Sequence, residues 1–440
     1  MKRVHLIAVG GAIMHNMAIA LKNRGYSVTG SDDAIYDPAK SNLEKAGLDV
    51  SVGWDANVIT SDIDAIILGM HARANNPELL RAKELGLDIM SFPEFVASES
   101  QDKKRVVVAG SHGKTTTTAM IMYVLSQLNV DFDYLVGSSI EGFDLSVKLT
   151  DAPLIIIEGD EYLSSPLDLR SKFLWYTPHV SIITGIAYDH INVFPTFDLY
   201  VDTFDQYVKS HADNGKYFWF AKDEHLQQLS ESNQTENASY DTPTFINETE
   251  GSRILSNGKD YPVSIVGKHN LENLRAAELV CNELGIDSDS FYKAAETFTG
   301  AGRRMEKIVS LPNQVVYRDF AHSPSKLKAT TEAIAETYNG KLLAVFELHT
   351  FSSLTEEFLP LYENSMDAAD SAIVFYNSAV FKHKKMKELD SEYVKNCFKN
   401  VEVLHSTETL RELVDSSFKR GDNILLMSSG KFDGAKFDFD

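Results

Sequence analysis

The chain has 440 residues, 43% of them hydrophobic, which is enough apolar material for the two to four domains expected at roughly 100–200 residues per domain. Its formal net charge of -21 at pH 7 argues against general affinity for nucleic acid or for an anionic membrane surface. Two cysteines are too few for a disulfide framework, and no run approaches the roughly 20 apolar residues that span a bilayer, so we expect a cytoplasmic protein without membrane insertion.

Residues 4–30 have the strand, glycine turn, helix and strand pattern of nucleotide-binding α/β units. The turn is Gly10-Gly11-Ala12, and the second strand ends at Ser31-Asp32. The glycine fingerprint of dinucleotide sites is incomplete, because Ala8 and Ile13 occupy two of the glycine places. A different nucleotide ligand is therefore more plausible than a dinucleotide.

The rest of the first hundred residues continues this alternation. We expect a strand at residues 65–70 that leads into His71, a helix at 78–85 and a short strand at 88–91. The polar run at 98–104 then predicts a domain boundary.

The strongest motif follows that boundary. Residues 106–108 are β-branched and predict a buried strand, and the turn after them reads Gly110-Ser111-His112-Gly113-Lys114-Thr115-Thr116 before an apolar helix. In such a turn the backbone N–H groups converge on phosphate oxygens at the helix N-terminus. Lys114 would reach the terminal phosphates and the Thr115 hydroxyl would bind Mg²⁺, although Val108 stands where the longer motif has its first glycine.

Acidic and histidine side chains follow two later strands. The apolar run at 154–157 predicts a central strand and delivers Glu158, Asp160 and Glu161. The strand expected at 180–184 leads to Asp189-His190. Because open α/β sheets bind ligands at the carboxyl ends of their strands, this pattern predicts a Mg²⁺–nucleotide site. Standing alone, His190 would as readily be a surface or core histidine.

Residues 223–262 are polar and rich in turn signals, and we expect loops with a small hairpin there. His269-Asn270 follows at a loop-to-helix junction, and Asn273 lies one helical turn beyond Asn270 on the same face. Ordinary helix capping is the alternative explanation for these residues.

A third α/β domain is expected from residue 300. The strand predicted at 315–317 leads into a polar loop that contains Asp319 and His322, and a helix is expected at about 326–338. Further strands are predicted at 342–347, 371–376 and 424–427.

Taken in order, these motifs resemble the Mur ligases, the ATP-dependent amide-forming enzymes of peptidoglycan synthesis. The resemblance covers nearly the whole chain. It implies an α/β fold with a Rossmann-like UDP-sugar domain at residues 1–100, a P-loop ATPase domain at 101–299 and a Rossmann-like C-terminal domain at 300–440. The motifs that carry it are Gly10-Gly11-Ala12, Gly30-Ser31-Asp32, Gly110 to Thr116, Glu158-Gly159-Asp160-Glu161, Asp189-His190, His269-Asn270 with Asn273, Arg303-Arg304, and Asp319 to Pro324.

The resemblance also implies roles for individual residues, with ATP and Mg²⁺ as cofactors. The catalytic set would be Lys114, Arg304, His190 and His112. The nucleotide contacts would be Gly110, Ser111, His112, Gly113, Lys114, Thr115, Thr116, His269, Asn270, Asn273, Arg304, Asp319 and His322. The magnesium ligands would be Thr115, Glu158 and His190. The substrate contacts would be Gly10, Gly11, Ala12, Ser31, Asp32, His71 and Arg170.

Two branches of the family compete. One adds L-alanine to UDP-N-acetylmuramate, and the other attaches L-Ala-γ-D-Glu-meso-diaminopimelate to the same acceptor in peptidoglycan recycling. The run from Glu158 to Tyr162, the segment at 168–173 and the ending at 427–432 are more similar to the peptide-adding branch, which we favour.

The sequence departs from the family pattern in three places. Gly185 and Ala187 stand where relatives usually have Asn and Glu, and Asn192 replaces an acid. The segment at 349–353 replaces one that normally carries arginine and helps to choose the amine. A nucleotide-binding relative that has lost ligation therefore stays open as a third reading, while a dehydrogenase is weaker still. The oligomeric state stays open.

Overall fold

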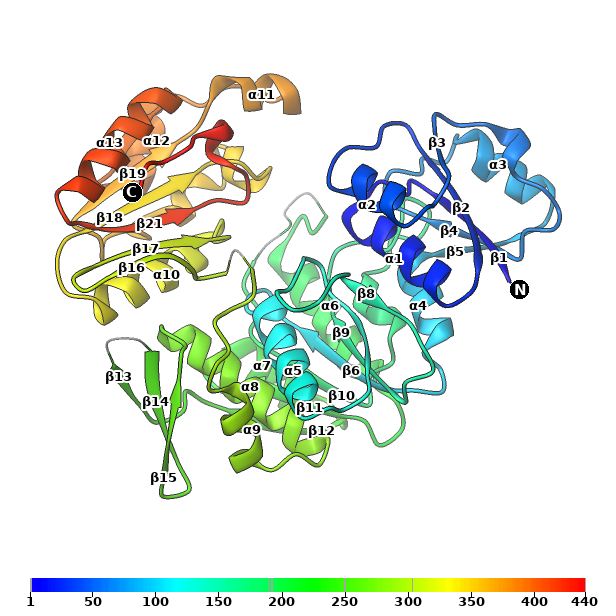
Figure 1. Ribbon diagram of the computed structural model, residues 1–440, viewed down its shortest axis with the longest axis horizontal. Coiled ribbons are helices and arrows are strands. Elements are labelled where there is room, and N and C mark those ends of the chain that lie inside the picture. The colour runs from blue at the N-terminus through cyan, green and yellow to red at the C-terminus, as the bar shows by residue number, and fades with distance from the viewer. Residues whose placement is uncertain (1, 189, 191–192, 249–250, 303, 440) are drawn as a thin grey trace. The chain divides into compact units, whose positions relative to one another are not determined.

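Helices and strands alternate through most of the described chain, so the fold is of the α/β class that the sequence predicts (Figure 1). The computed structural model describes residues 2–188, 190, 193–248, 251–302 and 304–439. The expectations for Asp189, Asn192 and Arg303 therefore lie outside the described residues. Two compact units divide the chain: unit 1 holds the described residues of 1–188, 193–241 and 276–291, and unit 2 holds those of 189–192, 242–275 and 292–440.

The first sheet of unit 1 is parallel, with strand order β3-β2-β1-β4-β5. This is the order of one dinucleotide-binding half extended by further strands. Its strands are β1 (Arg3–Ile7), β2 (Ser27–Asp32), β3 (Val50–Val52), β4 (Ala65–Leu68) and β5 (Asp88–Ser91). Its helices are α1 (Ala12–Asn23), α2 (Ala39–Lys45), α3 (Pro77–Glu84) and α4 (Phe92–Glu99).

Local signals explain where these helices begin. The Asn76 side chain accepts hydrogen bonds from two N–H groups at the start of α3, and Pro77 occupies its first turn. Ser91 and Glu94 form a capping box at the start of α4. Both arrangements satisfy N–H groups that a helix terminus otherwise leaves without a partner.

The second sheet of unit 1 has the order β12-β11-β10-β6-β9-β7-β8, parallel except for β8. Its strands are β6 (Lys104–Ala109), β7 (Asp133–Leu135), β8 (Val147–Lys148), β9 (Leu154–Glu158), β10 (Val180–Ile183), β11 (Lys216–Phe220) and β12 (Glu236–Tyr240). The accompanying helices are α5 (Lys114–Gln127), α6 (Phe197–Lys209), α7 (Glu224–Ser232), α8 (Lys268–Glu283) and α9 (Ser288–Ala295). Residues 268–275 of α8 belong to unit 2, and residues 276–291 belong to unit 1.

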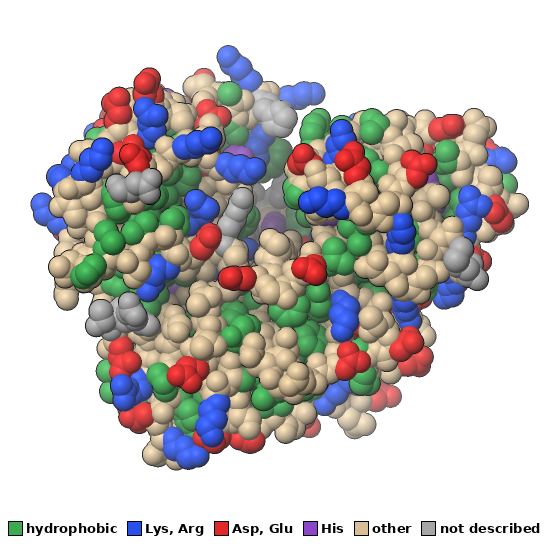
Figure 2. Space-filling model, viewed as in Figure 1, with side chains coloured by type: hydrophobic (Ala, Val, Ile, Leu, Met, Phe, Trp, Pro, Cys, Tyr) green, Lys and Arg blue, Asp and Glu red, His purple; other side chains and the backbone are tan. Residues whose placement is uncertain are grey.

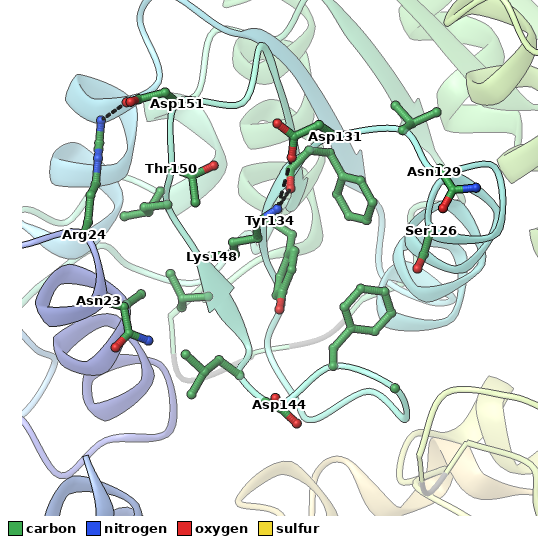
Figure 3. A pocket seen from close by; sticks show the side chains of 18 residues that line it. Asn23, Arg24, Ser126, Asn129, Asp131, Tyr134, Asp144, Lys148, Thr150 and Asp151 are labelled. Carbon is green, nitrogen blue, oxygen red and sulfur yellow. Dashed lines mark hydrogen bonds and ion pairs between the residues drawn. The ribbon is translucent and has the colours of Figure 1, made fainter.

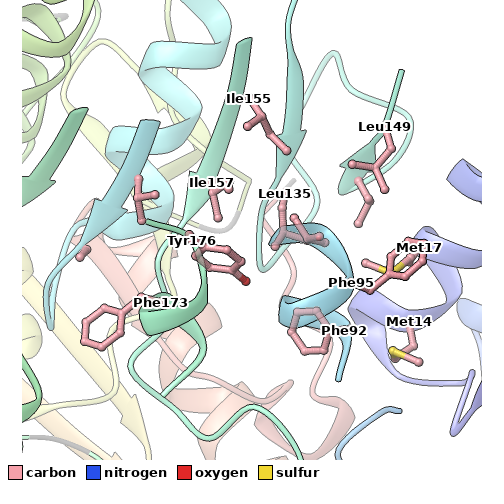
Figure 4. Packing of buried hydrophobic residues seen from close by; sticks show 14 of the residues in the cluster. Met14, Met17, Phe92, Phe95, Leu135, Leu149, Ile155, Ile157, Phe173 and Tyr176 are labelled. Atoms are coloured by element: carbon pink, nitrogen blue, oxygen red, sulfur yellow. The ribbon is translucent and has the colours of Figure 1, made fainter. Parts of the chain in front are cut away.

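One hydrophobic cluster joins the two sheets of unit 1 across the predicted boundary at 98–104. Met14 and Met17 from α1 lie near Phe95 of α4, and Leu135 and Leu149 come from the edge of the second sheet (Figure 4). All of these side chains are at most 4% exposed. The polar run at 98–104 therefore separates two sheets that share one core.

Two buried polar groups stabilise this unit. Lys103, at the start of the second sheet, forms an ion pair of 3.0 Å with Asp133, whose side chain is fully buried. His211 follows α6, where its Nε2 accepts from the Ser181 hydroxyl at 2.7 Å and its Nδ1 lies 2.9 Å from the Val208 carbonyl. Burial lowers the pKa of His211 to about 4, so the imidazole is neutral in the folded protein.

The region at 223–263 is more regular than the sequence predicts, because it begins with helix α7 and strand β12. Where loops and a hairpin were expected, an antiparallel sheet in the order β13-β14-β15 forms in unit 2 from β13 (Phe245–Glu248), β14 (Gly251–Ser256) and β15 (Lys259–Val263). Strands β13 and β14 show no alternation of buried and exposed residues, and β15 shows it only over its last residues, so their sequence is hard to distinguish from loop.

The large sheet of unit 2 has the order β16-β17-β21-β18-β19-β20, with β16 antiparallel to its neighbour. Its strands are β16 (Glu306–Leu311), β17 (Gln314–Asp319), β18 (Leu342–Glu347), β19 (Ser371–Phe375), β20 (Glu402–Leu404) and β21 (Asn423–Met427). Its helices are α10 (Pro324–Thr337), α11 (Ser378–Lys384), α12 (Ser391–Phe398) and α13 (Thr407–Lys419). Strand β17 is longer than predicted and includes Asp319, which was expected in the loop beyond it.

Acidic and basic side chains are interspersed on the face that Figure 2 shows. Within the described part of the chain, no helix combines the length and the apolar character needed to cross a membrane.

Candidate functional site

The predicted phosphate loop lies at the carboxyl edge of the second sheet. It connects β6 to the N-terminus of α5, and β6 lies between β10 and β9. Gly110 has φ +121°, and a Cβ at this position would lie 2.3 Å from the Thr184 hydroxyl. Only glycine fits this close approach, which brings the loop backbone against the end of β10. The loop thus places backbone N–H groups at a helix N-terminus, as the motif predicts.

Lys114 turns back toward the loop and toward β9. Its Nζ donates to the Gly110 carbonyl at 2.7 Å and forms an ion pair of 2.7 Å with Glu161, whose side chain is 1% exposed. Burial alone would lower the pKa of Lys114, but the carboxylates of Glu161, Asp160 and Glu158 outweigh burial and raise that pKa above its ordinary value. A charged ammonium is therefore held beside the loop, where a phosphate would need it.

Thr115 and Glu158 form the second half of the site. The Thr115 hydroxyl donates to Glu158 Oε1 at 2.7 Å, and the Gly137 N–H donates to Glu158 Oε2 at 2.8 Å. Two of the predicted magnesium ligands are thus in contact. No group of three or more His, Cys, Asp or Glu side chains gathers as a metal site among the described residues.

The other loop residues are fixed mainly through their backbone. The Ser111 N–H donates to the Gly185 carbonyl at 2.9 Å, and the Thr184 hydroxyl donates to the His112 carbonyl. His112 and Gly113 are partly exposed, whereas the Thr116 side chain is buried at the start of α5.

The N-terminal candidates divide into two groups. The Gly10 N–H donates to Asp32 Oδ2 at 2.7 Å, and burial raises the pKa of the Asp32 carboxyl. Gly11, Ala12 and His71 are at least partly exposed.

Two further predicted substrate contacts of unit 1 differ in exposure. Ser31 is 0% exposed, and its hydroxyl donates to Glu78 beneath the sheet edge, so the Ser31 side chain does not reach the surface. The Arg170 guanidinium lies over the Trp175 ring at 3.8 Å and pairs with Asp168, about half exposed.

The remaining predicted nucleotide contacts belong to unit 2. Asn270 and Asn273 are 7% and 8% exposed on α8, and the Asn270 side chain donates to the Val266 carbonyl. Burial lowers the pKa of His269, while the nearby Asp319 carboxylate opposes that shift. The structure therefore brings the start of α8 and the end of β17 together, although 50 residues separate His269 from Asp319.

Arg304 and His322 lie around the same strand end. The Arg304 guanidinium is 4.4 Å from the centre of the Phe320 ring, and Asp319 accepts from the Met305 N–H at 3.0 Å. His322 Nδ1 lies 2.9 Å from the Phe320 carbonyl. His190, also in unit 2, is partly exposed and has a left-handed backbone with φ +55°.

Sequence reasoning missed Gly137 and Tyr200. Gly137 follows β7, which pairs with β9, the strand that ends at Glu158. Recognising β7 as a strand in the sequence would have given a weak indication that Gly137 lies beside Glu158. The Tyr200 hydroxyl lies 2.8 Å from Ser111 and donates to Glu161 at 3.0 Å. Nothing in the sequence marks Tyr200, because the contact joins residues 89 positions apart.

Another cavity of about 830 Å³ lies in unit 1 between the end of α1, the end of α5 and the β7–β8 edge (Figure 3). Four of its charged side chains form ion pairs, Arg24 with Asp151 and Lys148 with Asp131, and Asp144 also lines the cavity. The phosphate loop contributes none of its lining residues.

Comparison with known families matches nearly the whole chain. Residues 3–104 match "Mur ligase family, catalytic domain", residues 108–281 match "Mur ligase middle domain", and residues 303–430 match "Mur ligase, glutamate ligase domain". The order of these three domains agrees with the predicted three-domain architecture.

Similar proteins carry two different names. The chain is 30% identical to a UDP-N-acetylmuramate–L-alanine ligase of Caldicellulosiruptor bescii, over 90% of this chain and 91% of that protein. It is 27% identical to a UDP-N-acetylmuramate–L-alanyl-gamma-D-glutamyl-meso-2,6-diaminoheptandioate ligase of Escherichia coli, over 98% of this chain and 96% of that protein.

Solved structures agree on the fold. A UDP-N-acetylmuramate-alanine ligase from Thermotoga maritima has a TM-score of 0.73 at 22% identity, and a murein peptide ligase from Psychrobacter arcticus has 0.69 at 23%. Both alignments cover 99% of this chain and 97% of the solved chain.

Proposed function

This chain belongs to the Mur ligase family of ATP-dependent ligases, and we propose that within the family it is a peptide ligase. Its acceptor would be the lactyl carboxylate of UDP-N-acetylmuramate, and its amine would be L-Ala-γ-D-Glu-meso-diaminopimelate, recovered during peptidoglycan recycling. Relatives carrying both this name and that of the L-alanine ligase support the shared acceptor.

The reaction proceeds in two steps. The acceptor carboxylate attacks the γ-phosphorus of ATP, which forms an acyl phosphate and releases ADP. The peptide amine then attacks the acyl carbon, and collapse of the tetrahedral intermediate releases inorganic phosphate and leaves the amide, with the amine proton passing to solvent. Lys114 and the N–H groups at the start of α5 neutralise charge on the transferring phosphoryl oxygens.

The residues of the loop fit a magnesium ion. Thr115 and Glu158 present a hydroxyl and a carboxylate within hydrogen-bond distance of each other, and hard oxygen donors are those that Mg²⁺ prefers. Bound there, the ion would supply charge stabilisation to the phosphates of ATP. Glu158 is held ready by the Gly137 N–H, which fixes one of its carboxylate oxygens.

The observation that carries the choice of amine is a cationic pocket in unit 2. This cavity of about 570 Å³ lies over the ends of β17 and β21, and its charged lining residues are Arg318, Lys431 and Lys436. Its described lining includes no Asp or Glu, and Glu306, outside that lining, lies 3.9 Å from the Arg318 guanidinium. In a chain of net charge -21, such a local concentration of cations suits an amine substrate with several carboxylates. The tripeptide has several carboxylates, whereas alanine has one.

The loop that carries Lys431 is held by a buried carboxylate. Glu347, at the end of β18, is 5% exposed and accepts from the Ser428 hydroxyl and from the Phe432 N–H, the latter at 2.8 Å. These bonds give the loop a defined conformation beside the pocket. Lys431 is therefore presented from a fixed loop, which lowers the entropy lost on binding a peptide.

A further cation lies next to the segment that lacks the expected arginine. Lys384, near the end of α11, has its Nζ 4.4 Å from the centre of the Phe351 ring. Burial lowers the pKa of His349, and the nearby Lys384 charge lowers it further against the opposing Glu347 carboxylate. Lys384 thus places an ammonium group beside the 349–353 segment, although burial lowers its pKa.

The second candidate is the L-alanine ligase of peptidoglycan synthesis. It is favoured by one observation, the 30% identity to a relative of that name. The two candidates share the nucleotide site and the acceptor, so only the amine distinguishes them.

Charge removal at the pocket tests the proposal. We expect Lys431→Ala with Lys436→Ala to raise the KM for the tripeptide by about tenfold or more, since each lost carboxylate contact is worth about 1 kcal/mol. The KM for ATP should not change. Lys395→Ala, an exposed lysine of α12 outside the pocket, is the matched control. An unchanged KM for the tripeptide in the double variant would contradict the assignment of this pocket.

A further inference from the structure

A continuous chain of hydrogen bonds runs beneath the phosphate loop. The Ala187 N–H donates to Ser111 Oγ at 2.8 Å, and Ser111 Oγ lies 2.8 Å from the Tyr200 hydroxyl. The Tyr200 hydroxyl donates to Glu161 Oε1 at 3.0 Å, and Lys114 Nζ lies 2.7 Å from Glu161 Oε2.

The proton count fixes the direction of every bond in this chain. A hydroxyl carries one proton, and that of Tyr200 is donated to the Glu161 carboxylate, which can only accept. Ser111 must then donate to the Tyr200 oxygen, which leaves the Ser111 lone pairs for the Ala187 N–H. The N–H of Ala187 and the hydroxyls of Ser111 and Tyr200 thus all donate in the direction of Glu161. Hydrogen bonds aligned in this manner polarise and strengthen one another.

These residues come from four separate parts of unit 1. Ser111 lies in the phosphate loop, Glu161 follows β9, Ala187 follows β10 and Tyr200 is in α6. Ser111 is 2% exposed, and Tyr200 and Glu161 are 0% exposed. Breaking one of these bonds therefore leaves a buried polar group without that partner, because water cannot take the partner's place.

We propose that Tyr200 is a positioning residue of the nucleotide site. Its hydroxyl joins the loop through Ser111 to the carboxylate of Glu161, and Glu161 in turn sets the position of the Lys114 ammonium. An ammonium has three N–H donors, of which the Gly110 carbonyl and Glu161 take two. The third is directed by this arrangement toward the phosphates. Tyr200 acts through other residues and does not itself touch ATP.

The inference extends the ATP dependence of the family and does not depend on which amine is joined. Nucleotide binding alone can test it, so its failure is distinguishable from failure of the proposed substrate. ADP with Mg²⁺ is the probe for binding, and steady-state kinetics with the amine that supports turnover give the separate KM values.

The test compares Tyr200→Phe with Tyr207→Phe. Both tyrosines are on α6 and are 0% exposed, and each substitution removes one hydroxyl, but that of Tyr207 lies outside the chain of bonds. We expect Tyr200→Phe to raise the Kd for ADP and the KM for ATP about five- to tenfold. This is the effect on nucleotide binding expected when part of the free energy of one hydrogen bond to a charged group is lost. The KM for UDP-N-acetylmuramate should stay within about twofold of wild type in both variants.

A double-mutant cycle provides a second measurement of the Ser111–Tyr200 interaction, in case one variant folds poorly. Ser111→Ala and Tyr200→Phe both break the Ser111–Tyr200 bond, so we expect the double variant to lose less nucleotide affinity than the sum of the two single losses. Additive losses would overturn the proposal, as would equal Kd values for ADP in Tyr200→Phe and Tyr207→Phe. Loss of thermal stability without a change in Kd or in the KM for ATP would reduce Tyr200 to a structural residue and would also overturn it.

Discussion

Replacing Lys114 by methionine should damage both catalysis and folding, and the structure allows the two effects to be separated. The substitution removes the ammonium that would stabilise the transferring phosphoryl group. It also leaves the Glu161 carboxylate, whose side chain is 1% exposed, without its cation at 2.7 Å.

The two effects have different expected sizes. Losing one preorganised group that stabilises developing charge lowers kcat by about 10²–10³ fold. Breaking a buried ion pair from one side costs about 3–5 kcal/mol of stability, because the remaining charge stays buried. The single variant Lys114→Met should therefore be nearly inactive and clearly less stable than wild type.

The double variant Lys114→Met with Glu161→Gln distinguishes these causes. With no charge left in the pair, most of the lost stability should return in urea unfolding followed by circular dichroism, while kcat for phosphate release stays low. If the double variant is as unstable as Lys114→Met, the ion pair does not account for the cost. If it regains activity, Lys114 has no catalytic role.

Three further results are expected from other parts of the chain. The stability that neutral His211 contributes should be fully present above pH 6.5 and should fall by about 3 kcal/mol as the pH drops from 6.5 to 4, because the pKa of His211 in the folded protein is about 4. In urea unfolding, His211→Gln should flatten this pH dependence, and an unchanged slope would contradict the prediction. Glu158→Gln should raise the Mg²⁺ concentration for half-maximal activity at least about tenfold, measured by titration at saturating ATP, and an unchanged requirement would remove Glu158 from the metal site. Lys103→Met should leave the fully buried Asp133 unpaired and cost about 3–5 kcal/mol with little change in kcat, and a loss under about 1 kcal/mol would refute this.

Local motifs made the place of the Gly110 to Thr116 loop and of Glu158 in the fold predictable. The Gly110 to Thr116 turn lies between a strand and a helix, and that local pattern determines where its N–H groups point. The position of Glu158 at the end of β9 followed from the apolar run before it, and β9 does pair with β6. Both inferences needed only residues close together in the chain and the common edge of a parallel sheet.

Contacts across the chain were not predictable in this way. The hydroxyl of Ser31 is bonded to Glu78, 47 residues away, so a residue at a strand end turned inward. Tyr200 contacts Glu161 over 39 residues, although an isolated aromatic on an amphipathic helix reads as ordinary core. Only a small hairpin was predicted where the three-stranded β13–β15 sheet forms, because these short strands carry too few apolar residues to show a period.

The measurement that tests the central claim most directly is phosphate release from Mg-ATP and UDP-N-acetylmuramate with two amines in parallel, L-alanine and L-Ala-γ-D-Glu-meso-diaminopimelate. The cationic pocket around Arg318, Lys431 and Lys436 predicts release with the tripeptide and a new amide product of matching mass. Release with L-alanine alone would contradict the peptide assignment and place the protein at the first step of stem synthesis. Silence with both amines would contradict ligation of either kind.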